Sequence, residues 1–219
     1  LLMAVARRVA EADRHVRRGD WKVAWGLTTM LGSDVHGKTL GIIGLGRIGS
    51  AVARRAKGFN MRIIYQSRTR KTDFEKESGA EYADLETLLG ESDFVTLHVP
   101  LADETYHLIG ERELRLMKKS AYLVNTSRGS VVDEKALHEA LKEGRIAGAA
   151  LDVFEEEPID LGNPLLRMGN VVFAPHMASV SVETRTKMAI MAVESLISAL
   201  EGRTPPNLVN KEVVGVRPP

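Results

Sequence analysis

A glycine-rich turn between two apolar runs constrains the fold of this chain more than any other feature. The first run, Thr39–Ile43, is short and apolar, as expected of a buried parallel strand. Gly44, Gly46 and Gly49 follow with the spacing G-x-G-x-x-G, and an amphipathic segment with helical periodicity leads from them to a second apolar run, Met61–Tyr65. The order strand, glycine turn, helix, strand predicts a βαβ unit.

Each glycine of this turn has a physical purpose. Gly44 allows the tight turn, Gly46 lets a pyrophosphate approach the backbone, and Gly49 lets the helix pack closely on the strand. The helix N-terminus offers free N–H groups and a positive dipole end to the phosphates. A glycine-rich turn alone can lack any ligand, but here the strand and helix stand on either side of it, as a dinucleotide site requires. The turn residues expected to contact the cofactor are Gly44, Leu45, Gly46, Arg47, Ile48 and Gly49.

Composition excludes several classes of function. The 219 residues carry a net charge of +1, so the chain lacks the basic field of a nucleic-acid-binding protein. Cysteine is absent, which excludes disulfides and thiolate metal sites and fits a reducing, cytoplasmic location; we expect no metal site. The longest apolar segment, Met188–Leu200, is interrupted by Glu194, so we expect no membrane partner.

Beyond the first unit, apolar runs alternate with helical patterns. This alternation predicts an α/β fold with a doubly wound parallel sheet, of the Rossmann type. The predicted strands are Thr39–Ile43, Met61–Tyr65, Asp93–Val99, Ala121–Asn125, Ala147–Val153 and Val171–Ala174. The predicted helices are Leu1–Arg18, a short one within Thr69–Gly79, Asp84–Leu89, Glu111–Met117, Asp133–Lys142 and Ser181–Leu200. The tail to Pro219 is expected to be loop-like.

The N-terminal residues 1–36 are expected to form a helix and a loop. Two tryptophans, Trp21 and Trp25, lie close together in the loop. They either pack into the core or meet a second subunit, because aromatic side chains are enriched at interfaces. We expect a homodimer that uses this segment.

Polar residues follow the ends of the predicted strands, where ligands bind in parallel sheets. Any one of them alone is more often structural or solvated than functional. An arginine, a carboxylate and a histidine at the same rim of the sheet, however, indicate a reactive site beside the cofactor. The residues concerned are His98, Pro100 and Thr105; Thr126, Ser127 and Arg128; Asp152 and Glu157; and His176.

Five motifs resemble those of the D-isomer-specific 2-hydroxyacid dehydrogenases over essentially the whole chain. The stretch 65–69, Tyr-Gln-Ser-Arg-Thr, is most similar to the glyoxylate and hydroxypyruvate reductase branch. The motifs are Gly-Leu-Gly-Arg-Ile-Gly (44–49), Leu-His-Val-Pro-Leu (97–101), Asn-Thr-Ser-Arg-Gly (125–129), Leu-Asp-Val-Phe-Glu-Glu-Glu-Pro (151–158) and Ala-Pro-His (174–176).

The resemblance implies a hydride transfer between NAD(P)H and a small 2-oxo acid. By it, Arg128, Glu157 and His176 match the family's catalytic residues, and Asp152 matches its nicotinamide-side aspartate. These roles fit the chemistry of the side chains. Histidine titrates near neutral pH and can protonate an alkoxide, a neighbouring carboxylate favours its charged form, and the planar fork of arginine suits a 2-oxo acid. The residue after Met177, Ala178, is also expected at the cofactor; it replaces the usual glycine there and narrows the backbone choices.

Cofactor choice is predicted from the end of the second strand. Gln66 stands where NAD-preferring members of the family carry an acid, which would bond the ribose 2′-hydroxyl and repel a 2′-phosphate. Ser67, Arg68 and Thr69 place two hydroxyls and a guanidinium beside the same position. We predict a preference for NADP, with NAD also possible.

The resemblance also predicts how the chain divides. Residues 1–176 are expected to be the dinucleotide-binding domain, and 177–219 a C-terminal segment that returns to the substrate domain. Family members begin with roughly a hundred residues of substrate domain. Leu1 starts inside an apolar pattern, so we expect the chain to be part of a longer protein. By itself, the chain is expected to bind the dinucleotide but to turn over substrate poorly. Two alternatives remain open: phosphoglycerate dehydrogenase, and a nucleotide-sensing corepressor that shares the fold.

Overall fold

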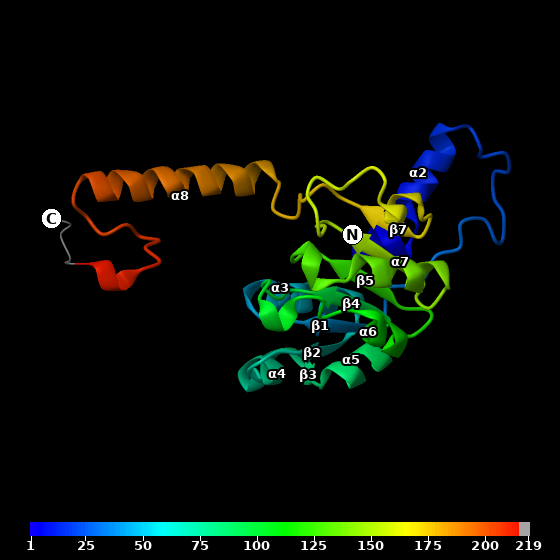
Figure 1. Ribbon diagram of the computed structural model, residues 1–219, viewed down its shortest axis with the longest axis horizontal. Coiled ribbons are helices and arrows are strands. Elements are labelled where there is room, and N and C mark those ends of the chain that lie inside the picture. Colours follow the sequence, from blue (N-terminus) through cyan, green and yellow to red (C-terminus); the bar gives the residue numbers. More distant parts are fainter. Residues whose placement is uncertain (215–219) are drawn as a thin grey trace. The chain divides into compact units, whose positions relative to one another are not determined.

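The computed structural model describes residues 1–214 and divides the chain into two compact units, Leu1–His176 and Met177–Pro219. The first unit holds every strand of the described chain (Figure 1). The second is built on one long helix, α8 (Val182–Leu200), whose first turn is capped by the Ser181 hydroxyl accepting from the backbone N–H of Thr184 at 3.1 Å. A 3₁₀ turn, Lys211–Val213, follows, so the tail is not wholly loop-like; residues 215–219 lie outside the described part.

The first unit is organised around a seven-stranded, wholly parallel sheet, which confirms the predicted fold class. The strand order is β3-β2-β1-β4-β5-β6-β7, so the chain builds one half of the sheet and then crosses to the other side of β1. A crevice at the carboxyl ends of β1 and β4 is the expected ligand position in such sheets. The strands are β1 Thr39–Ile43, β2 Arg62–Gln66, β3 Glu81–Tyr82, β4 Phe94–Leu97, β5 Tyr122–Asn125, β6 Gly148–Leu151 and β7 Val171–Phe173.

Helices connect the strands, as the sequence predicts, with one correction at the N-terminus. The single helix expected over Leu1–Arg18 is two helices, because Arg8 adopts a left-handed conformation with φ of 53°. The Arg8 guanidinium donates to Glu11 and to the carbonyl of Leu31, which fixes this break. The helices of the unit are α1 Leu2–Ala6, α2 Val9–Arg17, α3 Arg47–Ala56, α4 Thr72–Ser78, α5 Leu85–Glu91, α6 Glu111–Leu116 and α7 Glu134–Lys142, with 3₁₀ turns at Lys57–Phe59, Asp103–Thr105, Gly129–Val131 and Pro164–Arg167.

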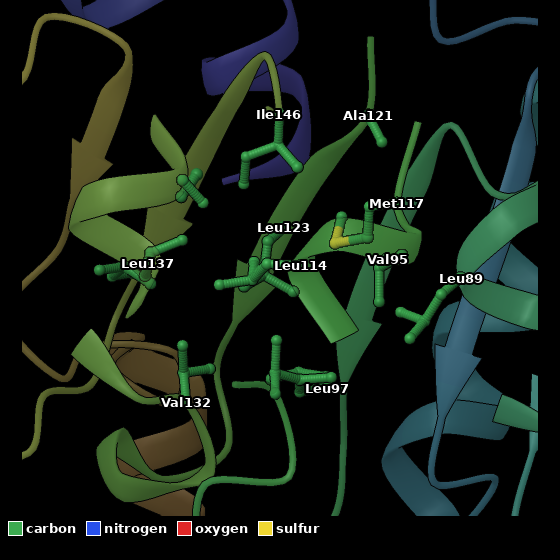
Figure 2. Close-up of a cluster of buried hydrophobic side chains, with 14 of the residues drawn as sticks. Leu89, Val95, Leu97, Leu114, Met117, Ala121, Leu123, Val132, Leu137 and Ile146 are labelled. Atoms are coloured by element: carbon green, nitrogen blue, oxygen red, sulfur yellow. The ribbon is translucent and has the colours of Figure 1, made fainter. Parts of the chain in front are cut away.

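Two hydrophobic clusters form the core, one on each face of the sheet. Successive strand residues alternate between them: Ile42 belongs to one cluster and Ile43 to the other, and Val124 and Leu123 alternate in the same way. The cluster drawn in Figure 2 joins side chains of β4 and β5 to α5, α6 and α7. Because both faces are covered, the strands read as continuous apolar runs, which is why the sequence identifies them.

The two tryptophans of the N-terminal loop are on the surface. Trp21 is 56% exposed and Trp25 is 76% exposed, so the expectation that they pack into the core is wrong. No helix within residues 1–214 has the length and apolar character needed to cross a membrane.

Candidate active site

The carboxyl ends of β1, β2 and β4 border a cleft of about 360 Å³. Three segments line it: the glycine turn after β1, the loop 66–69 after β2, and the residues that follow β4, among them His98. The structure therefore brings together three of the segments that the sequence assigns to the cofactor.

The glycine turn is shaped for a close ligand. Gly44 has φ of 97°, and a Cβ atom built there would lie 2.5 Å from the carbonyl oxygen of His98, so this position needs glycine. A Cβ atom on Gly46 would meet nothing within 4 Å, which leaves open space where the pyrophosphate would approach. Leu45 is buried beneath the turn, while Arg47 and Ile48 begin α3 at the surface. The turn fits a dinucleotide.

The loop after β2 places a guanidinium at the cleft. Gln66 ends the strand, and the Ser67 hydroxyl donates to the carbonyl of Thr69 at 2.7 Å, which closes the loop on itself. Arg68 is exposed and lines the cleft. Within residues 1–214 the structure gives its side chain no hydrogen bond and no ion pair, so its charge is available to a ligand.

His98 forms the other side of the cleft in its neutral state. Burial lowers the pKa of His98 from the usual 6.5 to about 4. Its Nε2 lies 3.1 Å from the Thr96 hydroxyl. Farther along, the Thr105 hydroxyl donates to the carbonyl of Pro100 at 2.7 Å and accepts from the N–H of Ala102 at 2.8 Å, which holds this wall in shape.

The loop after β5 is fixed by a residue that the sequence reasoning left out of the site, Asn125. Its side-chain oxygen accepts from both the N–H and the hydroxyl of Ser127, at 3.0 and 2.9 Å, and its Nδ2 donates to the carbonyl of Arg128 at 2.9 Å. Asn125 is 1% exposed, Thr126 is half-buried and the Arg128 side chain reaches the surface. The sequence signal for this role was an amide side chain at the end of the apolar run 121–125.

The ends of β6 and β7 bring a histidine and a carboxylate into contact. His176 Nδ1 lies 2.6 Å from Glu157 Oε2, although the two residues are 19 positions apart in the chain. The backbone N–H of His176 donates to the carbonyl of the buried Asp152 at 2.8 Å. His176 has φ of 50°, a conformation that costs on the order of 1–3 kcal/mol for a residue with a side chain and is typical of functional sites.

Opposing effects act on the Glu157 carboxyl. Burial raises its pKa. Two hydrogen bonds lower it, one with His176 and one from the N–H of Phe154 at 3.0 Å, and so do the charges of His176 and Arg128. Together these effects outweigh burial and hold the pKa below its usual 4.5. Glu157 is therefore a carboxylate at neutral pH. The positive charge of Arg128 is thus among the causes that keep Glu157 ionised.

Two further expectations concern Ala178 and metal ions. Ala178 belongs to the second unit, Met177–Pro219, and its contact with the cofactor stays a prediction. Among residues 1–214, no three histidine or acidic side chains gather so that they would hold a metal ion.

Comparison with known proteins identifies the family. The model of the D-isomer specific 2-hydroxyacid dehydrogenase NAD binding domain matches residues 1–178, most of the chain. The chain belongs to the D-isomer specific 2-hydroxyacid dehydrogenase family. The resemblance read from the five motifs is thereby confirmed, and the Gly44–Gly49 turn lies in the NAD binding domain of that family.

Several relatives match this chain over its whole length. A glyoxylate reductase of Korarchaeum cryptofilum is 68% identical over 219 residues, and one of Aeropyrum pernix is 60% identical over 222 residues. In both, the match covers 100% of this chain and 66% of the relative, so the chain spans about two thirds of their length. The crystal structure of the TT0316 protein from Thermus thermophilus is 48% identical, with a TM-score of 0.90 over 95% of this chain and 65% of that one.

Proposed function

We propose that this chain carries the cofactor domain and the acid–base residues of an NADPH-dependent reductase of small 2-oxo acids, glyoxylate or hydroxypyruvate. The product is the 2-hydroxy acid, of D configuration where a stereocentre forms. The observation that carries the proposal is the contact of 2.6 Å between His176 and Glu157, at the same edge of the sheet as the Gly44–Gly49 turn.

The His176–Glu157 pair supports a defined proton transfer. When bound, the nicotinamide supplies the hydride to the carbonyl carbon of the substrate. Glu157 is hydrogen-bonded to Nδ1 of His176, so Nε2 is the ring nitrogen that can donate a proton to the carbonyl oxygen of the substrate. The carboxylate orients the ring and favours its charged form, and general acid catalysis of this kind contributes roughly 10²–10⁴ in rate.

Arg128 is proposed to hold the 2-oxo acid. A guanidinium presents a planar fork of donors, which matches a carboxylate better than the ammonium of lysine does. Its backbone carbonyl accepts from Asn125, and its Nη1 donates to the carbonyl of Ser127 at 2.6 Å, so one nitrogen of the guanidinium is fixed to its own loop while the residue reaches the surface. Asp152, buried under His176, is proposed to face the nicotinamide.

The substrate and cofactor follow from separate observations. Relatives at 68% and 60% identity are called glyoxylate reductase, which supports glyoxylate as a substrate. Gln66 carries no charge to repel a 2′-phosphate, and Arg68 lines the same cleft, which supports NADPH over NADH.

We also propose that two copies of the protein associate through the N-terminal segment. Trp21 and Trp25, both exposed, supply the large aromatic surface that interfaces favour. Light scattering should give twice the mass of one chain, and replacing both tryptophans by alanine should shift the protein toward the monomer.

Steady-state assays of the full-length protein test the proposed activity. NADPH and NADH are each paired with glyoxylate, hydroxypyruvate and 3-phosphohydroxypyruvate. We expect the highest kcat/KM with NADPH and one of the two unphosphorylated acids. A clear preference for 3-phosphohydroxypyruvate would favour a phosphoglycerate dehydrogenase instead, and cofactor binding without reduction of any acid would favour a binding protein.

A further inference from the structure

Residues 62–71, from the start of β2 to the residue before α4, carry four basic side chains, and carboxylates neutralise two of them. Arg62 pairs with Glu81 and Glu91 at 2.6 and 2.7 Å, and Arg70 pairs with Glu75 at 2.9 Å. Arg68 and Lys71 have no ion pair within the described residues 1–214, and both line the cleft of about 360 Å³. The segment therefore presents two unpaired positive charges to one cavity.

The position of Lys71 is set by a buried hydroxyl. The backbone N–H of Lys71 donates to the Tyr65 hydroxyl at 2.7 Å, and this hydroxyl donates in turn to Glu75 Oε1 at 2.6 Å. Tyr65 is wholly buried in β2. The loop 66–71 is thus fastened at its far end to the strand from which it departs.

The protonation states of this network suit its geometry. Burial, together with the Glu75 carboxylate, raises the pKa of Tyr65 above its usual 10, so the hydroxyl keeps its proton. Hydrogen bonds from Arg70 and Tyr65 lower the pKa of Glu75 to about 2, so this carboxylate stays charged. The network therefore keeps these charges at neutral pH. Because Arg70 is paired with Glu75, Arg68 and Lys71 are the basic side chains that line the cleft without a carboxylate partner in residues 1–214.

We propose that Lys71 is a second specificity-determining residue for the phosphorylated dinucleotide, which binds the ribose 2′-phosphate together with Arg68, and that Tyr65 is the positioning residue for Lys71. The inference rests on the proposed NADPH preference and extends it. A phosphate dianion is suited to one guanidinium fork and one ammonium point charge. Glu104 is the one carboxylate among the described residues that line the cleft, so positive charge prevails there.

Dissociation constants for NADPH and NADH, measured by fluorescence on the full-length protein, test the role of Lys71. Lys71→Ala should weaken NADPH by about tenfold and change NADH by less than about twofold, because only NADPH carries the 2′-phosphate. Lys76→Ala, which removes a cation of α4 away from the cleft, is the matched control and should alter neither constant. The affinity of the wild type for NADPH should also fall more steeply with salt than that of Lys71→Ala.

The role of Tyr65 is tested by Tyr65→Phe, which keeps the ring and removes only the hydroxyl. The variant should lose part of the NADPH-over-NADH preference, although Tyr65 touches no ligand. Combined with Lys71→Ala, it should lower the preference no further, because both act on one contact. Independent, additive losses would overturn the positioning role.

The outcomes separate this inference from the proposed function. If the wild type prefers NADPH and Lys71→Ala keeps that preference, Lys71 does not bind the 2′-phosphate and the inference fails alone. If the wild type binds NADPH and NADH equally well, the proposed preference fails and the inference falls with it.

Discussion

At the scale of single residues, the state of Glu157 determines how the site responds to pH. Its carboxylate lies 2.6 Å from His176 Nδ1 and, with its pKa held below 4.5, carries its charge throughout the neutral range. Removing that charge by Glu157→Gln makes a protonated ring less favourable. We expect a loss of about tenfold or more in kcat for reduction, and the pH above which reduction slows should move to lower values. A pH profile that keeps its position in Glu157→Gln would show that the carboxylate does not act on His176.

Arg68 offers the most direct single-residue test of cofactor choice. A hydrogen bond to a charged group contributes about 1.5–3 kcal/mol, so Arg68→Ala should weaken NADPH by roughly ten- to a hundredfold. NADH lacks the 2′-phosphate and should bind almost as before. Equal losses for both dinucleotides in a binding titration would remove Arg68 from the specificity site.

His98 links the cofactor cleft to acid stability. Its pKa is about 4 in the folded protein and 6.5 when freely exposed, so as the pH falls from 6.5 the unfolded chain takes up a proton that the folded protein resists. The folded protein therefore loses stability between pH 6.5 and about 4. In thermal unfolding at pH 7 and pH 5, His98→Gln should show a smaller drop in Tm than the wild type. An unchanged drop would assign the acid sensitivity to other groups.

At the scale of elements, two glycines of one turn should fail in different ways. Gly44→Ala would place a Cβ atom 2.5 Å from the carbonyl oxygen of His98 at φ of 97°, so we expect a loss of folding stability of about 2 kcal/mol or more. Gly46→Ala meets nothing within 4 Å and should cost less than about 1 kcal/mol, yet weaken the dinucleotide by about tenfold or more, because it fills the approach to the pyrophosphate. Denaturant unfolding and NADPH titration of both variants separate the two effects.

The sequence predicts the elements with an apolar core face and misses those without one. All six predicted apolar strands are present, and Asp84, the first residue of the predicted helix 84–89, caps α5 by accepting from the N–H of Thr87 at 2.8 Å. The edge strand β3, Glu81–Tyr82, was missed because it is two exposed residues with no apolar run. The break at Arg8 depends on a tertiary contact with Leu31, which periodicity does not report.

At the scale of the whole molecule, the order of the strands assembles the candidate site. Arg128, Glu157 and His176 come from loops that are far apart in the chain. These loops leave the same edge of the sheet because β5, β6 and β7 are neighbours with parallel direction. A parallel sheet puts all carboxyl ends at one edge, so this gathering follows from the fold class that the sequence predicts. The supporting contacts of Asn125, Tyr65 and Lys71 could not be predicted from the sequence, because each depends on the exact path of a loop.

The most direct test of the account is turnover of glyoxylate and NADPH by the full-length His176→Ala variant, with NADPH binding measured on the same sample. The control is His36→Ala, which removes an exposed histidine whose Nε2 contacts Asn60 at 2.9 Å, outside the site. We predict that His176→Ala lowers kcat by roughly a hundredfold or more, while its NADPH affinity and the activity of His36→Ala stay close to wild type. A kcat of His176→Ala close to that of the wild type would contradict the assignment of His176 as the proton donor.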